Sequence, residues 1–541
     1  MNSLVWDKSL VGNALSAIGG LTVDVLEYAR DLLNLYCGGA YSSDYYNVLL
    51  GDWLLHFTHI VYAEWQECVS GRYLSGVTGR VNFPVAGDLS DHGRLRLQNE
   101  YRESLRAGII AMLEKPSFEG FDFSNERVAV DPRYGFEDNK WFFSFNRFRA
   151  STIKAIPRII GSSKADILVS SPYSKNSINT WFLALWKWRR FLAHNDFCYP
   201  VSISATIDSA WRLARSLEQR SLPGFEGILR SLIPLHLPVA LLEGFVDLRK
   251  TVLSIPHHRP KAVYSANALH NQLVWKIRVA EWREEGTKLL YHQHGGGYGL
   301  DRIHAIEEYE TSVSDRYYTF GWHSDQAHIK PLPVGMGPIN RHSPQRILLS
   351  CVNYPKVVYR IHFQPMPGTV EVMHRQTCDF LKALPDRSDL LVRPFFEDYG
   401  WGFVDMMRRA APDAEFDTAG VSSFMRYAES KLVVHNYLGT GWLETLALDI
   451  PTVCFYDDNT YAFRDAAQPY INGLEVVGIL HRSGKSAAAF VAGLGNNIES
   501  WWKEAEVQDA RRAFVSNYAN FSPDWMKHWE QEFKSVLDEA V

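Results

Sequence analysis

Two histidines and a glutamine stand directly before a run of glycines near the middle of the chain. The segment reads Tyr291-His292-Gln293-His294-Gly295-Gly296-Gly297-Tyr298-Gly299. An imidazole can transfer a proton near neutral pH or bind an anion, and glycines let the backbone approach a ligand closely. The alternative is structural, with rings bonded to carbonyls and glycines that only make a turn. We interpret His294 as catalytic and assign substrate binding to its neighbours His292, Gln293, Gly295, Gly296, Tyr298 and Gly299.

A pair of histidines two residues apart is also a possible metal site. On a strand, His292 and His294 would point to one face and Gln293 to the other. Zinc needs further ligands, however, and no third ligand lies at a recognisable spacing. An Asp-x-Asp motif is not evident either. We therefore predict metal-free chemistry and no bound cofactor.

A second glycine-rich turn follows another apolar strand. Within His435–Leu446, the chain runs through Gly439-Thr440-Gly441 straight into a helix. The N–H groups at a helix N-terminus are unpaired and carry a partial positive charge, which suits a phosphate. The alternative is an ordinary strand–turn–helix with a capping box. We expect a nucleotide here, with its ribose near Glu444, bound by Asn436, Gly439, Thr440, Gly441, Glu444 and Thr445.

One arginine and several acids complete the candidate groups. Arg393 ends a strand, where it could clamp a phosphate or carboxylate, or instead pair with Glu397 or Asp398. Glu307 and Glu310 are three residues apart on a predicted helix and share a face, so we include both in substrate binding.

An isolated acid in an apolar stretch is a further candidate. Glu243 lies between two leucines and Gly244-Phe245. Apolar surroundings raise the pKa of a carboxyl group, as a base or nucleophile requires. We name Glu243 as a second catalytic candidate. A solvated helix acid is the alternative for Glu243, as it is for Glu307 and Glu310.

Strands and helices alternate along most of the chain, which is typical of doubly wound parallel sheets. We expect a mainly helical segment over residues 1–150, including helices at Val23–Leu35 and Tyr46–Trp65. Two Rossmann-like domains should follow at 151–335 and 336–541, with a ligand in the cleft between them. Expected strands lie at 166–169, 262–265, 288–291, 317–320, 347–352, 390–393, 431–435 and 452–455, and expected helices at 176–194, 209–251, 269–285, 301–312 and 369–384.

Composition limits the class of protein. The 541 residues carry a formal net charge of −5, which argues against general nucleic-acid binding. The six cysteines form no CxxC pair and resemble free thiols of a reducing compartment. Neither a secretion signal nor an apolar run of about 18 residues is evident. We expect a cytoplasmic protein. A basic, aromatic helix at 181–190 is a core element or, alternatively, a contact with an anionic membrane surface.

The motifs together resemble a known family. The chain is similar to transferases encoded in O-antigen and surface-polysaccharide loci, first defined from leptospiral sequences. Between Asn267 and Gln272 the chain has amides where the family pattern has an acid. The resemblance is carried by Tyr46–Leu55, Tyr62, Trp65, Leu242–Phe245, Gln293–Gly299, Glu307, Glu310, Ser314-Asp315, Gly321-Trp322, Asn353–Pro355, Arg393, Tyr399–Trp401, Gly439–Glu444, Pro451-Thr452 and Phe463–Asp465.

This resemblance implies a two-domain glycosyltransferase of the GT-B type. The donor would be a nucleotide-activated sugar, linked to CMP or to another nucleotide, since the family is distantly similar to bacterial β-Kdo transferases. The acceptor would be a lipid-linked or polysaccharide chain bound by the helical segment and the first domain, with peripheral contact at the inner face of the inner membrane. Two alternatives remain: a phosphotransferase that uses CDP-polyols, and a non-catalytic polysaccharide assembly protein.

Overall fold

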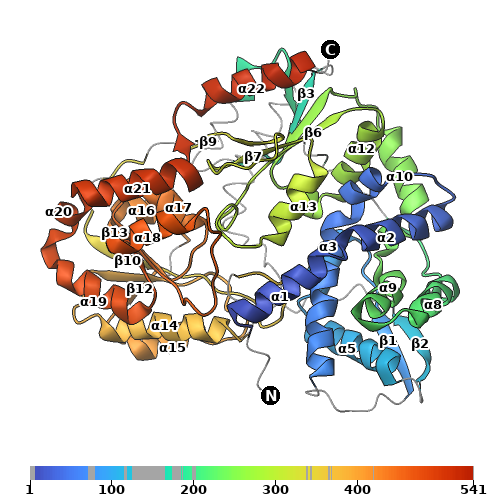
Figure 1. Cartoon of the computed structure of the whole chain (residues 1–541), viewed down its shortest axis with the longest axis horizontal. Coiled ribbons are helices and arrows are strands. Elements are labelled where there is room, and N and C mark those ends of the chain that lie inside the picture. Colours follow the sequence, from blue (N-terminus) through green and yellow to red (C-terminus); the bar gives the residue numbers. More distant parts are fainter. Residues whose placement is uncertain are drawn as a thin grey trace.

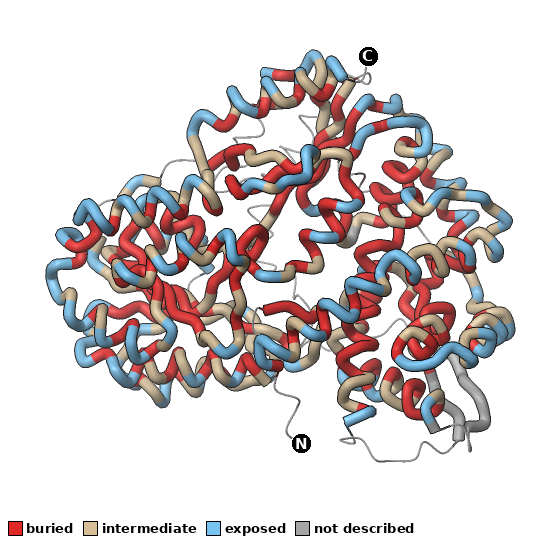
Figure 2. Tube along the Cα trace, viewed as in Figure 1, coloured by how far each residue is buried: buried red, intermediate tan, exposed pale blue. Residues whose placement is uncertain are grey.

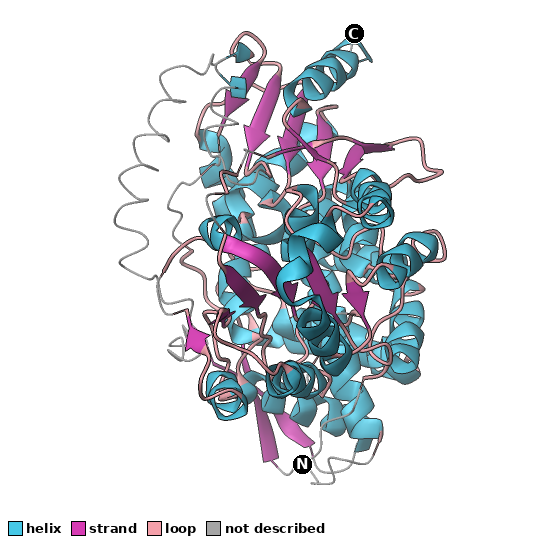
Figure 3. Ribbon diagram, turned by 90° about the vertical axis from the view of Figure 1, so that its left-hand side faces the viewer, coloured by secondary structure: helices cyan, strands magenta, loops and turns pink. Residues whose placement is uncertain are grey.

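Two six-stranded parallel sheets form the centres of two Rossmann-like domains (Figure 3). The computed structural model describes residues 6–70, 79–114, 118–124, 165–173, 184–185, 187–195, 197, 203–336, 339–341, 344–363, 366, 368–417 and 420–539. Together with the helical N-terminal segment, this arrangement confirms the predicted α/β class with two Rossmann-like domains.

The first sheet lies within the central part of the chain. Its order is β4 (Leu192–His194), β3 (Ile167–Ser170), β5 (Ala262–Ser265), β6 (Lys288–His292), β7 (Arg316–Thr319) and β8 (Ile329–Pro331). The helices α11 (Ala268–Asn271), α12 (Leu273–Glu284) and α13 (Ala305–Val313) connect its later strands. Four of the strands, β3, β5, β6 and β7, are buried along most of their length, as expected when helices cover both faces of a parallel sheet.

The second sheet has the strand order of a dinucleotide-binding domain, 3-2-1-4-5-6 in its own numbering. That order is β12 (Glu415–Phe416), β11 (Leu390–Arg393), β10 (Arg346–Ser350), β13 (Ser430–His435), β14 (Thr452–Phe455) and β15 (Leu480–His481). The order reverses between β10 and β13, so their carboxyl ends open into a crevice. The helices of this domain are α14 (Val370–Ala383), α15 (Phe403–Ala410), α16 (Ser423–Glu429), α17 (Thr440–Ala447), α18 (Gln468–Val476), α19 (Gly484–Leu494), α20 (Ile498–Trp502) and α21 (Ala505–Tyr518).

The N-terminal segment is built around one long buried helix. This helix, α3 (Ser43–Val69), begins where the Ser42 hydroxyl accepts a hydrogen bond from the Tyr45 N–H at 3.1 Å. It contacts α11, α12 and α13 of the first domain, and most of its residues are buried (Figure 2). The other elements are α1 (Lys8–Gly19), α2 (Thr22–Cys37), α4 (Leu89–Leu95), α5 (Asn99–Glu114) and the paired strands β1 (Gly79–Pro84) and β2 (Phe118–Ser124).

The helical stretch expected at 209–251 is divided into three helices. Prolines 223 and 238 break it into α8 (Ser209–Glu218), α9 (Gly224–His236) and α10 (Phe245–Ser254), with short 3-10 turns between them. Helix α9 contacts α2, α3 and α5, so this stretch extends the helical segment rather than covering the sheet (Figure 1). The predicted helix at 176–194 also fails at its end, because Leu192–His194 pairs with β3 as an edge strand; residues 174–183 lie outside the described part.

The last helix, α22 (Trp525–Glu539), returns to the first domain (Figure 1). The ring of Trp529 packs edge-on against Tyr264 and Tyr318 at 4.9 Å, and its N–H donates to the Pro333 carbonyl at 2.9 Å. Buried Trp188 joins this cluster, which favours a core position for the described part of the basic, aromatic stretch. The second domain therefore does not include α22, although the sequence placed all of 336–541 there.

No single helix among the described residues has both the length and the apolar composition needed to cross a bilayer. One bent pair, α1 with α2, meets these two criteria together across an angle of 44°.

Truncation of Trp529 should test the return of α22. Trp529→Ala should lower the free energy of unfolding by about 3–5 kcal/mol, because it leaves a cavity between the helix and β5–β7. The shift of the urea transition measures this loss. Phe396→Ala is the control, since Phe396 is 73% exposed and should give almost no change. Equal effects of the two substitutions would contradict the packing described here.

Candidate active site

The two predicted glycine-rich segments touch each other across the domain boundary. The Gly296 N–H donates to the Thr440 hydroxyl at 3.2 Å. A Cβ atom on Gly296 would lie 2.7 Å from the Gly439 carbonyl carbon, closer than real Cβ contacts come. The loop after β6 and the turn after β13 therefore meet at a contact that only glycine permits, and the sheets bring their carboxyl ends to the same place.

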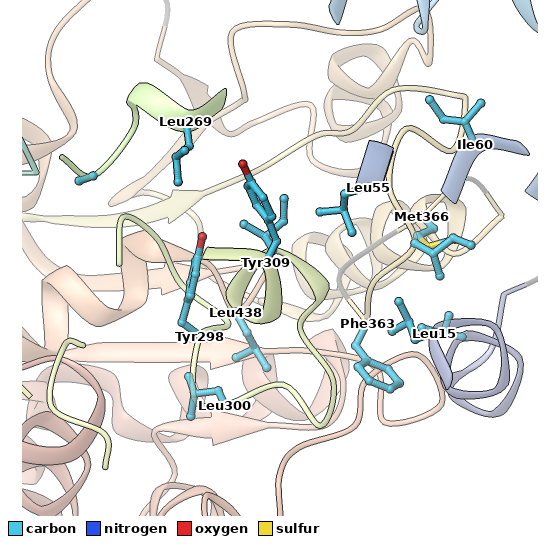
Figure 4. Packing of buried hydrophobic residues seen from close by; sticks show 14 of the residues in the cluster. Leu15, Leu55, Ile60, Leu269, Tyr298, Leu300, Tyr309, Phe363, Met366 and Leu438 are labelled. Atoms are coloured by element: carbon cyan, nitrogen blue, oxygen red, sulfur yellow. The ribbon is translucent and has the colours of Figure 1, made fainter. Parts of the chain in front are cut away.

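His294 lies beside a buried carboxylate. Its Nδ1 is 3.3 Å from Oε1 of Glu310, and the Tyr298 hydroxyl donates to the same oxygen at 3.3 Å. The Glu310 side chain is fully buried, whereas that of His294 is 22% exposed. Burial holds the pKa of His294 well below its ordinary value, so the ring is a neutral proton acceptor at pH 7. Figure 4 shows the hydroxyl ends of Tyr298 and Tyr309 turned towards Leu269.

A second histidine joins Glu310 to an acid of the N-terminal segment. His270 donates from Nδ1 to Asp52 at 2.8 Å and from Nε2 to Glu310 at 3.1 Å. Burial alone would lower the pKa of His270, but the two carboxylates outweigh it and raise the pKa to about 9. His270 is therefore an imidazolium that bridges two acids from distant parts of the chain. The amide-containing stretch 267–272 thus carries a functional candidate that its composition did not reveal.

The same cluster has the composition of a metal site. His270, His294 and Glu310 offer ligand atoms that all lie within 4.8 Å of one another. His292 is not part of this cluster, and the two groups that join His294 come from α11 and α13. Asp52 would then be the carboxylate that orients the metal-bound histidine, a common arrangement.

Arg360 also faces this region, and the sequence gave no reason to select it. It lies in the loop after β10, which leaves the sheet where the strand order reverses. Its positive charge acts on the pKa of His294, Tyr298 and Tyr437, although burial is the larger cause for each of these groups. Strand order would have pointed to this loop, but strand order is not visible in a sequence.

His292 and Gln293 have structural contacts. His292 ends β6 and is buried against Tyr264, with burial lowering its pKa to about 3. Gln293 accepts from the Phe320 N–H at 3.0 Å and the Trp322 indole N–H at 2.9 Å. The expectation that both histidines point to one face is wrong. Strand β6 ends at His292, so the alternation of side chains along a strand does not extend to His294.

Glu307 connects the two domains. It accepts from Arg464 at 2.6 Å and from the Gly299 N–H at 2.6 Å. Asp301 adds a second connection, because its carboxylate accepts from the Tyr461 hydroxyl. At the same boundary a cavity of about 690 Å³ opens, lined among others by Lys8, Arg302 and Phe463.

Several predicted nucleotide-binding groups bond within the second domain. Asn436 donates to the Thr377 hydroxyl at 3.1 Å and accepts from the Val352 N–H at 3.0 Å. Thr445 lies 3.1 Å from His435 and is buried, as is Glu444. A Cβ on Gly441 would lie 3.0 Å from the His435 ring and from the Tyr427 hydroxyl, so this glycine serves packing. Thr440 is the partly exposed hydroxyl of the turn.

Arg393 and Glu243 each bond a partner that the sequence did not identify. Arg393 pairs with Asp417 at 2.7 Å, rather than with Glu397 or Asp398. Glu243 accepts from the Arg212 guanidinium on both oxygens, at 2.6 and 2.7 Å, and from the Asp208 N–H. An ion pair that uses both oxygens leaves Glu243 unsuited to act as a base. The carboxylate beside His294 is Glu310 instead.

The bridging role of His270 should appear in its titration. Its ring resonances should titrate near pH 9 in NMR spectra, and Asp52→Asn should lower that value, because one carboxylate contact is lost. Since the folded pKa exceeds the unfolded value of about 6.5, the stabilisation is complete below pH 6.5 and is lost as pH rises through about 9. A pKa at or below 6.5 would contradict the bridge.

Solved structures similar to the chain share little sequence with it. A variant of S. aureus TarM with one substitution has 11% identity and a TM-score of 0.36, covering 54% of this chain and 59% of TarM. Acinetobacter baumannii MurG has 9% identity and a TM-score of 0.37, covering 69% and 99%. Anabaena HepE, solved with UDP-glucose, has 14% identity and a TM-score of 0.37, covering 68% and 99%. No curated protein matches the chain.

A sequence profile covers nearly the whole chain. It matches residues 2–533 and describes a transferase family. Those residues include the contacting glycine loops, the Asp52–His270–Glu310 cluster and Arg360. The chain belongs to the LIC12162 family of transferases.

Proposed function

We propose that this transferase moves a sugar from a nucleotide-activated donor to a growing surface polysaccharide. The observation that carries the proposal is the contact between the His294 loop and the Thr440 turn at the carboxyl ends of two parallel sheets. Ligands of such sheets bind at the carboxyl ends of the strands. Family membership supports a group transfer, and a neutral imidazole at the crevice supports activation of a hydroxyl acceptor.

His294 is the general base in this proposal. Its neutral ring takes the proton of an acceptor hydroxyl, and Glu310 at 3.3 Å stabilises the imidazolium that forms. Burial raises the pKa of Glu310, and His270, Tyr298 and Tyr317 oppose this rise because all three donate to the carboxylate. The arrangement follows the logic of a catalytic triad, with the acceptor hydroxyl in the place of the serine.

The donor nucleotide binds at the crevice of the second domain. The N–H groups at the start of α17 and the Thr440 hydroxyl face the donor phosphate. Positive charge from Arg360 stabilises the leaving phosphate, so the transfer proceeds without a metal ion. The His270–His294–Glu310 cluster makes the opposite outcome testable: metal analysis of the purified protein and loss of activity with a chelator would reject metal independence while leaving the transfer intact.

Removal of the base should abolish most of the activity. His294→Ala should reduce kcat by about 10²–10⁴-fold with a panel of activated sugars, because general-base catalysis contributes that much. His323→Ala, which changes an exposed histidine outside the site, is the matched control. Unchanged activity in His294→Ala would remove His294 from the mechanism.

The products of that assay separate the possible reactions. Release of a nucleoside diphosphate, or of CMP from a CMP-sugar, is expected for sugar transfer. Transfer of a polyol phosphate from a CDP-polyol, with release of CMP, would replace the proposal by phosphotransfer. Failure of every activated donor to react would favour an assembly protein.

Substitution of Thr440 should test whether the nucleotide binds at this turn. A nucleotide at a hundred times its Kd should stabilise the wild type by about 2.7 kcal/mol in a thermal-shift screen. Thr440→Val should reduce this shift because it removes the hydroxyl, whereas Thr440→Ser should keep it. Equal shifts in both variants would place the nucleotide elsewhere.

A further inference from the structure

Two arginines from different parts of the chain face the same aromatic ring. The guanidinium carbon of Arg96, at the end of α4, lies 5.8 Å from the centroid of the Tyr359 ring. That of Arg360 lies 5.9 Å from the same centroid. Both side chains are partly buried, and the Nε atom of each is buried without a hydrogen-bond partner.

The backbone around this pair is held in place by the N-terminal segment. Fully buried Arg102 donates to the carbonyl oxygens of Arg96 and Val358, and pairs with Glu64 at 2.7 Å. The His59 ring accepts from the Ile361 N–H at 2.9 Å. Both arginine-bearing segments are therefore anchored by groups other than the two guanidinium groups, which are left available.

The two arginines of this pair lack direct ionic contacts with the residues that the structure describes. In the described part of the chain, no carboxylate lies within ion-pair distance of Arg96 or Arg360. Burial lowers the pKa of Arg96, the charge of Asp52 raises it without a direct contact, and the charge of Arg360 lowers it. The buried arginines of the scaffold differ from this pair, since Arg102 pairs with Glu64 and Arg212 with Glu243.

Two partly buried cations without a counter-charge are costly unless an anion neutralises them. A guanidinium group binds phosphate oxygens in bidentate fashion. Two guanidinium groups beside one aromatic ring can bind the same phosphate. The pair joins the N-terminal segment to the loop of the second domain where the strand order reverses. Arg360 also faces the His294 loop, so a bound anion would lie next to the candidate active site.

We propose that Arg96 and Arg360 form a clamp for a phosphate group of a substrate. The proposal deepens the proposed function and rests on it for the nature of the substrate, while the clamp itself is a binding site for phosphate. Two sources share this chemistry: the phosphates of the nucleotide donor, and a phosphate carried by the acceptor. Tyr359 holds both guanidinium groups in position through cation–π contacts.

Calorimetric titration of the full chain tests the clamp without any transfer reaction. The probes are inorganic pyrophosphate, a panel of nucleoside diphosphates and glycerol phosphate, in a buffer free of phosphate and sulfate. Arg96→Gln and Arg360→Gln should each weaken pyrophosphate binding at least tenfold. Arg94→Gln, which removes an exposed arginine paired with Asp91, should change it less than twofold.

The other probes identify the source of the phosphate. Loss of nucleoside diphosphate affinity in both variants assigns the clamp to the donor, and loss of glycerol phosphate affinity alone assigns it to the acceptor. Arg96→Lys and Arg360→Lys keep the positive charge but lose the planar, forked set of N–H donors of a guanidinium group. Both should still weaken pyrophosphate binding at least threefold. These variants decide the matter if a glutamine variant does not fold.

Unchanged affinity for all phosphate probes in both positions, or no binding of any probe by the wild type, would overturn the clamp. Failure of the proposed function looks different. A chain that binds phosphate through both arginines but transfers no sugar keeps the clamp and rejects the glycosyltransferase. If both variants transfer sugar with an unchanged KM, the glycosyltransferase function is kept and the clamp is rejected.

Discussion

The close approach of Gly296 to Gly439 is the contact on which the candidate site depends. Side chains at these positions would push the two loops apart, because a Cβ on Gly296 would already lie 2.7 Å from the facing carbonyl carbon. Once the backbones touch, Arg464 can reach Glu307 and Tyr461 can reach Asp301 across the boundary. The position of His294 relative to the Thr440 turn follows from this glycine contact and the bonds beside it.

Charge balance separates the scaffold from the site. The scaffold buries charges in closed pairs, such as Glu243 with Arg212. In the site, His270 shares its protons between Asp52 and Glu310, which leaves a carboxylate next to a neutral histidine. Arg96 and Arg360 form no ion pair with a carboxylate among the described residues. A buried charge that the protein does not balance itself favours a role with a ligand.

Much of the fold could be predicted because buried parallel strands are apolar runs that end in polar or glycine-rich loops. The strand expected at 431–435 is β13, Ser430–His435, and the one expected at 288–291 is β6. The prediction failed where tertiary contacts overrode local preference. The sequence of Leu192–His194 is typical of a helix end, but this segment pairs with β3. Helix α22 packs on the first domain instead of the second, because Trp529 contacts Tyr264 and Tyr318.

For the site, the sequence by itself determined which groups could do chemistry: the histidine beside the glycines, the acid at Glu310, and the glycine turn ahead of α17. Only the tertiary structure decided their partners. Asp52 and His270 are 218 residues apart in sequence, and His270 and Glu310 are 40 apart. It also decided that Glu243 pairs with Arg212 and that the charge of Arg360 acts on His294. Spacing along a chain records only neighbours on one helix or strand, whereas ion pairs and proton acceptors are chosen by distance in space.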